Sequence, residues 1–224
     1  MQRQACIKIA DIRVMKEVIR FMIPKTIQYC WYGGEKTQLA QNCIESWRRL
    51  LPGWQLCEWN EGNTDLHSCA YVEEAYAKGK YAFVADVVRL DMLVRHGGVY
   101  LDSDVELLRP LDALLDCGLF LGYESKHYFS TATIGALPGN KLLQSLLRLY
   151  QEMPHFPERP ATINTLLTDL FFRQYPLERK SGRQSYQGIE LYPEEVLCPV
   201  KTGGQIHSTD NTIAVHHFSG SWLK

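Results

Sequence analysis

The sequence has no excess of charge of either sign and no long apolar run. Its 224 residues include 24 Lys and Arg against 25 Asp and Glu, so the formal net charge is −1. Without a positive field, general charge attraction to nucleic acid is not expected. No apolar segment approaches the about 18 residues of a transmembrane helix, and residues 1–20 lack the apolar centre of a signal peptide. We therefore expect a cytoplasmic protein, with membrane contact limited to peripheral association at the inner face.

The cysteines also follow no recognisable framework. They number seven, at positions 6, 30, 43, 57, 69, 117 and 198, with no C-x-x-C pair and no spacing typical of a zinc site. A chain of this length does not need a disulfide scaffold, so reduced thiols in a core are favoured. Internal repeats, low-complexity tracts and linkers are missing too. Because the regular pattern begins only at Met22, we expect residues 1–21 to be an extension and residues 22–224 to form a single domain.

Segments typical of strands and helices alternate along most of the chain. Strands are predicted at 26–31, 54–59, 99–101, 119–123, 131–137, 189–192 and 212–217, and helices at 35–51, 69–78, 81–96, 141–153 and 163–172. This alternation predicts an α/β domain with a largely parallel central sheet. Ligands of such sheets bind at the carboxyl ends of the strands, so the residues that follow each strand deserve inspection.

A pair of carboxylates follows the strand predicted at 99–101. Asp102 and Asp104 are two residues apart, and on a strand such residues project to the same side. Two adjacent carboxylates repel unless a cation lies between them, and hard oxygen ligands suit Mn²⁺ or Mg²⁺. The pair therefore predicts a metal site for a diphosphate substrate. The alternative is a solvated turn.

Asp86 and Arg89 lie three residues apart on the helix predicted at 81–96. Apolar neighbours such as Val87 and Val88 mark that helix as buried. Charges in such a place are costly unless they are paired or used in a site. They form either an intrahelical salt bridge or part of a binding site.

Single candidate residues stand at both ends of the chain. Trp31 follows the first strand and could stack on a nucleobase, the alternative being a core aromatic. Near the C-terminus, His216 and His217 end a strand before a Ser-Gly-Ser loop. Adjacent strand residues point to opposite faces, so only one of the two histidines can face a site. An imidazole complements carboxylates around Mn²⁺, although a lone histidine is more often structural.

Taken together, segments 23–34, 43–47, 81–90, 97–106 and 216–222 resemble glycosyltransferase family 32. That family includes bacterial capsular-polysaccharide sugar transferases and yeast mannosyltransferases, and its core is similar to the glucosyltransferase domain of large clostridial toxins. The resemblance implies a GT-A fold, in which a Rossmann-like nucleotide-binding sheet continues into a smaller acceptor-binding part. It also implies transfer of a sugar, with retention of configuration, from a nucleotide sugar such as a UDP-sugar to a glycan or lipid-linked saccharide.

The resemblance assigns roles to individual residues. Trp31 would stack on the base, and Asp86 and Arg89 would contact the donor sugar and diphosphate. Asp104 would bind the metal directly, with Asp102 contacting ribose or metal-bound water and His217 as the third ligand. Ser221 and Trp222 would close over the diphosphate. The catalytic set would be Asp86, Arg89, Asp102 and Asp104, with Mn²⁺ or Mg²⁺ as cofactor.

Two other functions remain open on the sequence alone. A metal-dependent nucleotidyltransferase also uses an acidic pair, but the sequence Gly33-Gly34-Glu35 is a poor phosphate-binding loop. A non-catalytic module that binds sugar nucleotides or glycans would need no catalytic set. For a transferase, no additional carboxylate is evident as a nucleophile beneath the sugar, which favours front-side attack by the acceptor. Acceptor contacts are expected from loops 123–133 and 160–167, including Asn164.

Overall fold

The computed structural model describes residues 22–220 apart from 200, 203 and 204. The predicted extension 1–21 and the predicted closing residues Ser221 and Trp222 lie outside the described residues. The helices are α2 (Gln38–Leu50), α3 (Ala70–Ala77), α4 (Tyr81–His96), α5 (Lys141–Gln151), α6 (Ile163–Gln174) and α7 (Glu194–Leu197), with a 3-10 turn η1 (Asp112–Leu114). The strands are β1 (Thr26–Cys30), β2 (Gln55–Trp59), β3 (Gly98–Leu101), β4 (Val105–Leu107), β5 (Leu119–Tyr123), β6 (Phe129–Ala136), β7 (Gln184–Tyr186), β8 (Ile189–Tyr192), β9 (Lys201–Thr202), β10 (Gln205–Ile206) and β11 (Ala214–His216).

The central sheet is mixed rather than largely parallel. Within the described residues it has seven strands in the order β2-β1-β3-β6-β5-β8-β7. β1 runs parallel to β2 and β3, and β5 runs parallel to β8, whereas β6 is antiparallel to both of its neighbours and β7 to β8. The prediction of an α/β sheet is confirmed, and the prediction that the sheet is largely parallel is wrong, because three of its six strand pairings are antiparallel. The reason is that β5 and β6 form a hairpin, which needs no helical crossover.

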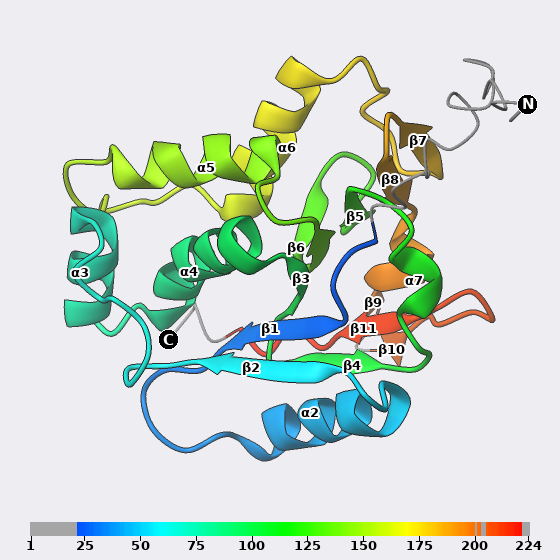
Figure 1. Ribbon diagram of the computed structural model, residues 1–224, viewed down its shortest axis with the longest axis horizontal. Coiled ribbons are helices and arrows are strands. Elements are labelled where there is room, and N and C mark those ends of the chain that lie inside the picture. Colours follow the sequence, from blue (N-terminus) through cyan, green and yellow to red (C-terminus); the bar gives the residue numbers. More distant parts are fainter. Residues whose placement is uncertain (1–21, 200, 203–204, 221–224) are drawn as a thin grey trace, which may run out of the picture.

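Structural elements cover both faces of this sheet (Figure 1). Helices α3, α4, α5 and α6 lie on one side, and α2 lies on the other with the short β4–β11 ribbon. Successive side chains of β3 point to opposite faces of the sheet. Tyr100 therefore packs on the α4 side, while Val99 and Leu101 pack on the α2 side. A residue that leaves the end of β3 therefore emerges between the two layers.

Two glycines fix the connection from α4 into β3. Gly97 ends the helix with φ +66°, and Gly98 follows with φ +99°. A Cβ on Gly98 would lie 2.6 Å from the backbone oxygen of Thr26 on β1, so no larger residue fits without moving the backbone. This tight turn sets α4 against the strands and places β3 directly beside β1.

Helix α2 supports the ribbon on the opposite face. The indole Nε1 of Trp47 donates a hydrogen bond of 2.7 Å to the backbone oxygen of Val105, and Leu107 N donates to Ser46 Oγ at 3.0 Å. The segment 43–47, which carried part of the sequence resemblance, thus holds β4 in place. β4 in turn pairs antiparallel with β11, with His216 opposite Val105. The C-terminal strand is thereby brought to the turn that follows β3.

Most predicted elements are present, with shifted boundaries. The first helix begins at Gln38 rather than Glu35, because the Thr37 side chain accepts from Ala40 N and caps it. The strands β4, β7, β9 and β10 and the helix α7 were not predicted. Each has only two to four residues, which is too few for a periodic pattern of apolar residues to be recognised in the sequence. Within the described residues, no helix has both the length and the hydrophobicity needed to cross a membrane.

Candidate active site

Two of the predicted site residues follow neighbouring strands at one edge of the sheet. β1 ends at Cys30 and β3 at Leu101, and the two strands are parallel neighbours. Trp31 and Asp102, which follow them directly, therefore leave the sheet at the same edge. This edge is where ligands bind in open α/β sheets.

Asp86, Arg89 and Asp102 form one ion-pair group. Arg89 Nη2 lies 2.9 Å from Asp86 Oδ1 and 3.2 Å from Asp102 Oδ1. Asp86 and Arg89 are 7% and 4% exposed, so both charges are largely removed from water. The predicted intrahelical salt bridge is present, and it continues to the carboxylate pair after β3. The two sequence alternatives for these residues are therefore compatible.

Further contacts hold the Arg89 guanidinium in place. Its Nη1 donates to the backbone oxygen of Thr131 at 2.8 Å, and its Cζ lies 4.5 Å from the centroid of the Tyr100 ring. Tyr100 also donates its hydroxyl to Asp102 Oδ1 at 3.0 Å. Burial disfavours the charged form, but the carboxylates of Asp102 and Asp86 raise the pKa of Arg89 above its usual range. Arg89 is thus a fixed cation between two carboxyl groups, and burial raises the pKa of one of them, Asp86, to about 7 despite the nearby guanidinium.

The carboxylate pair lies in a turn and not on a strand. β3 ends at Leu101 and β4 begins at Val105. The backbone N of Val105 donates to the backbone oxygen of Asp102 at 2.9 Å, which closes the turn. Asp102 N donates to Ala132 O at 2.9 Å, which attaches the start of the turn to β6. The strand geometry assumed for Asp102 and Asp104 is therefore wrong. A tight turn brings the two residues together instead, so that Asp102 faces Arg89 while Asp104 faces the C-terminal strand.

Asp104 is held from the C-terminal side. Its Oδ1 lies 3.3 Å from His216 Nε2, and its Oδ2 accepts from the backbone N of Ser219 at 2.8 Å. Burial favours the neutral acid, but the hydrogen bond and charge of His216, with the Ser219 amide, hold the pKa of Asp104 below its usual range. In turn, burial disfavours the imidazolium, yet the Asp104 contact raises the pKa of His216 to about 10. The ring of Phe218 lies 4.0 Å from the His216 ring.

The histidine beside the carboxylate pair is His216, which corrects the prediction of His217 as third ligand. His217 points the other way, and its Nε2 lies 3.0 Å from Glu106 Oε2. The cause is the register of β11, in which His216 is opposite Val105 and the next side chain turns to the opposite face. The sequence argument that only one of the two histidines can face the site is consistent with this arrangement.

Asp102, Asp104 and His216 together provide a donor set for a metal ion. One ligand atom from each lies within 4.8 Å of the others. Carboxylate oxygens with an imidazole nitrogen suit Mn²⁺, and the oxygens suit Mg²⁺. The residues present therefore fit a divalent cation.

Trp31 is held at the surface rather than in the core. Its Nε1 donates to Gly34 O at 2.7 Å, and Lys36 Nζ lies 6.0 Å from the ring centroid. The loop that carries it packs on α4, because a Cβ on Gly33 would lie 2.3 Å from the Tyr81 ring. A partly exposed, hydrogen-bonded indole at this edge could present a face to a base.

The two segments expected to contact the acceptor meet next to Arg89, but the contact joins strand β6, which carries Thr131, and helix α6, which carries Asn164, rather than two loops. Asn164 Oδ1 accepts from the Thr131 hydroxyl at 2.6 Å and from its backbone N at 3.1 Å. Asn164 Nδ2 donates to Glu124 Oε2 at 2.9 Å. Sequence reasoning named Asn164 but not Thr131 or Glu124 individually. No local signal marks those two, since their positions follow from the pairing of β5 and β6 and from α6.

Comparisons with known proteins bear on these residues. Residues 37–120 match the family model of the glycosyltransferase sugar-binding region containing the DXD motif. Two proteins of Schizosaccharomyces pombe are similar in sequence. Inositol phosphoceramide mannosyltransferase 1 is 29% identical over 44% of this chain and 33% of its own length. Inositol phosphoceramide mannosyltransferase 3 is 28% identical over 60% of this chain and 38% of its own length. The matches thus span 33% and 38% of the two relatives' lengths, well under half of each.

A solved structure has the same fold. The PaToxG glycosyltransferase superposes with a TM-score of 0.56 at 17% identity, over 75% of this chain and 77% of that one. The α/β fold of GT-A type predicted from the sequence is confirmed. The predicted resemblance to sugar transferases that carry an Asp-x-Asp motif is confirmed as well, and residues 86, 89, 102 and 104 all lie inside the matched region.

Proposed function

We propose that this chain, which carries the DXD-containing sugar-binding region of glycosyltransferases over residues 37–120, transfers a sugar from a nucleotide-sugar donor to a saccharide acceptor. The observation that carries the proposal is the junction at the end of β3. There Arg89 bridges Asp86 and Asp102, while Asp104 contacts His216. A cation and a metal-ligand set at one sheet edge are what binding of a sugar diphosphate requires.

Asp102, Asp104 and His216 would hold the divalent cation, Mn²⁺ or Mg²⁺. When bound, the cation neutralises negative charge on the departing diphosphate. The Ser219 amide, which donates to Asp104 Oδ2 at 2.8 Å, keeps that carboxylate turned toward the site. The Tyr100 hydroxyl, which donates to Asp102 Oδ1 at 3.0 Å, orients the Asp102 carboxylate in the same way.

The remaining residues would bind the donor. The buried Arg89 cation is fixed by its contacts with Thr131 and two carboxylates, so it could meet developing charge without reorganising. Asp86 would accept hydrogen bonds from sugar hydroxyls. Trp31 would stack on the base, and this assignment, which rests on the resemblance, favours a UDP-sugar.

We infer retention of configuration at the anomeric carbon. Asp86 and Asp102 both contact Arg89, and Asp104 contacts His216. Because this proposal assigns Asp86 to the donor sugar and Asp102 and Asp104 to the metal ion, none of the three is left as the base that an inverting reaction needs. Front-side attack by the acceptor hydroxyl, with a phosphate oxygen taking its proton, requires no such base. Proton NMR of the first product from an α-linked gluco- or galacto-configured donor tests the inference, and a β linkage would overturn it.

The acceptor is proposed to be a glycan or a lipid-linked saccharide, as in capsular or other surface-polysaccharide synthesis. Thr131 and Asn164, joined beside Arg89, would line its path. The names of the similar proteins add a mannosyl donor and an inositol phosphoceramide acceptor to the candidates worth testing.

The experiment is a donor panel with the full chain. Purified protein is incubated with Mn²⁺ or Mg²⁺ and with UDP- and GDP-linked sugars, and free nucleoside diphosphate is measured with and without glycan acceptors. We expect diphosphate release with one donor, lost on removal of the metal and in Asp104→Asn. Asp112→Asn is the matched control, because that aspartate is exposed and pairs only with Lys25 among the residues described. Release of pyrophosphate in a parallel incubation with a nucleoside triphosphate and a sugar 1-phosphate would instead indicate a nucleotidyltransferase, and donor binding without release would indicate a binding module.

A further inference from the structure

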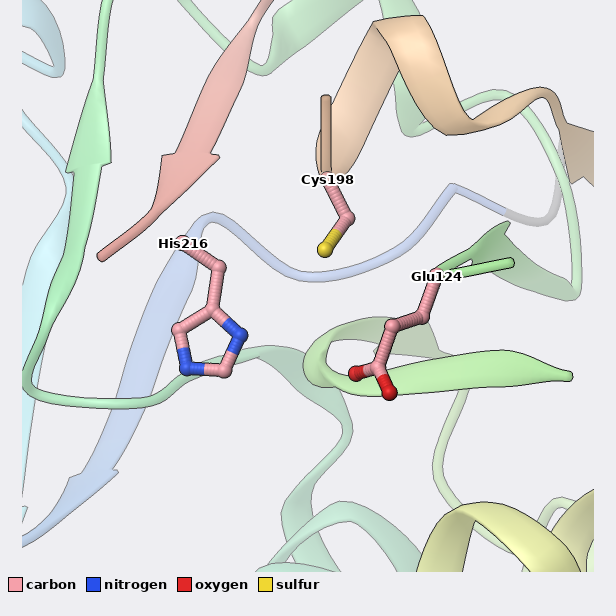
Figure 2. A group of neighbouring side chains, drawn as sticks. All are labelled: Glu124, Cys198 and His216. Carbon is pink, nitrogen blue, oxygen red and sulfur yellow. The ribbon is translucent and has the colours of Figure 1, made fainter. Parts of the chain in front are cut away.

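A second cluster of metal-ligating side chains adjoins the site just described. Glu124 follows β5, Cys198 follows α7 and His216 ends β11. One ligand atom of each lies within 4.8 Å of the others. Figure 2 shows the three side chains converging from separate elements, with one ring nitrogen of His216 on the side of the thiol and the Glu124 carboxylate.

The two nitrogens of His216 have different surroundings. Nε2 lies 3.3 Å from Asp104, whereas Nδ1 is buried and has no hydrogen-bond partner among the residues described. A buried polar atom without a partner is costly, and a bound ion is one way to satisfy it. Cys198 is only 1% exposed, and its thiol points toward the other two side chains (Figure 2).

We propose that Glu124, Cys198 and His216 Nδ1 form a second metal site, which takes a borderline-soft ion such as Zn²⁺ in preference to Mg²⁺ or Mn²⁺. Sulfur, nitrogen and carboxylate oxygen are the three ligand types that Zn²⁺ uses, and three protein ligands leave its fourth position open. A thiolate discriminates against the hard cations that suit the oxygen ligands at residues 102 and 104.

Asp104 would support this site by contacting the ligand His216 rather than the metal ion. A histidine that binds zinc through one nitrogen usually donates its other N–H to a carboxylate, and His216 Nε2 already faces Asp104. With Zn²⁺ on Nδ1, the Nε2 proton would be held against Asp104. The same imidazole could then no longer ligate the proposed catalytic cation through Nε2. Zn²⁺ is therefore expected to inhibit the transferase.

This inhibition rests on the proposed function, but the binding does not. Zinc binding is measured by competition with a chromophoric chelator in excess Mg²⁺, using the full chain. We expect one Zn²⁺ per chain, not displaced by Mg²⁺. Cys198→Ser should weaken binding by about 100-fold or more, because loss of even an outer partner of a metal ligand costs about 10- to 100-fold. Cys117→Ser is the matched control, since that thiol is also buried and donates to Leu114 O at 3.2 Å, as a hydroxyl can.

A spectroscopic readout identifies the sulfur ligand without any variant. Co²⁺ substituted for Zn²⁺ should show a thiolate-to-cobalt charge-transfer band in the wild type and in Cys117→Ser. The band should be lost in Cys198→Ser and retained, with weaker binding, in Glu124→Gln. The Gln side chain keeps an oxygen that can accept from Asn164, so this variant tests the site if Cys198→Ser does not fold.

Three results would overturn the site. They are the absence of a thiolate band in the wild type, Zn²⁺ binding that Mg²⁺ displaces, and equal Zn²⁺ affinity in the Cys198→Ser and Cys117→Ser proteins. If the donor panel finds activity, micromolar Zn²⁺ should suppress it in wild type far more than in Cys198→Ser. A silent donor panel would count against the proposed function alone, because the binding and spectroscopic results do not depend on turnover.

Discussion

The α4 side of the site and its C-terminal side hold their charged groups in different ways. On the α4 side, Asp86 and Arg89 lie on one helix and meet Asp102 in a largely buried network with Tyr100 and Thr131. On the C-terminal side, Asp104 is held by His216 from a three-residue strand and by one backbone amide. The first side is fixed by a helix packed in the core, and the second by a short ribbon.

This difference separates stability from ligand binding. Groups on the α4 side are already satisfied by one another, so removing one of them leaves buried charges without a partner. Groups on the C-terminal side retain free ligand capacity around Asp104 and His216, so their loss should show mainly in metal binding. Four predictions test this division, beginning with the largest effect.

Arg89→Ala should reduce the free energy of unfolding by about 3–5 kcal/mol, the cost of breaking a buried pair and leaving its partners uncompensated. Asp86 and Asp102 would both lose their cation. Urea denaturation measures the loss. Arg95→Ala is the control on the same helix, because its pair with Asp91 is solvent-exposed on the arginine side, with 64% of that side chain accessible, and should cost no more than about 1 kcal/mol. Equal losses would refute the division.

Asp104→Asn should cost less stability, about 1.5–3 kcal/mol, which is the range for a hydrogen bond to a charged group. The Asn oxygen can still accept from Ser219 N, so only the charge facing His216 is lost. Binding of Mn²⁺ should be abolished at concentrations that saturate the wild type. Isothermal titration with Mn²⁺, beside a thermal melt, measures both effects. Unchanged Mn²⁺ affinity would remove Asp104 from the metal site.

The sequence predicted the α4 side better than the C-terminal side. Asp86 and Arg89 are three residues apart on a strongly apolar helix, and a helix fixes such neighbours whatever the rest of the chain does. By contrast, the position of His216 depends on how a three-residue strand pairs with β4. A slip of one residue there would exchange the two histidines, and no local pattern determines the register. Glu124 and Cys198 depend in the same way on contacts between distant elements.

Trp31→Ala should weaken nucleotide binding by about 1–3 kcal/mol, the range for stacking of a base on an aromatic side chain. Trp31 is partly exposed, so the variant should stay folded. Trp47→Ala is the contrasting control, because that indole is fully buried and its loss should cost about 3–5 kcal/mol of stability. Fluorescence or calorimetric titration with the nucleoside diphosphate provides the affinity. Unaltered affinity of Trp31→Ala for the nucleotide would contradict base stacking, and the role of the indole would then be its hydrogen bond to Gly34 within the loop.

The smallest effect is expected for His217→Gln, which distinguishes the two adjacent histidines. The pair of His217 with Glu106 is partly solvent-exposed, at 25% and 39% for the two side chains, and such pairs contribute at most about 1 kcal/mol. Stability and Mn²⁺ affinity should therefore both stay near the wild-type values. His216→Gln removes the imidazole that contacts Asp104 and should weaken Mn²⁺ binding by about tenfold or more, as loss of a metal ligand or its close partner does. The same titration and melt on both variants provide the comparison. If His217→Gln were the variant that lost Mn²⁺ affinity, the register of β11 against β4 would have to shift by one residue, and the original choice of His217 as ligand would be restored.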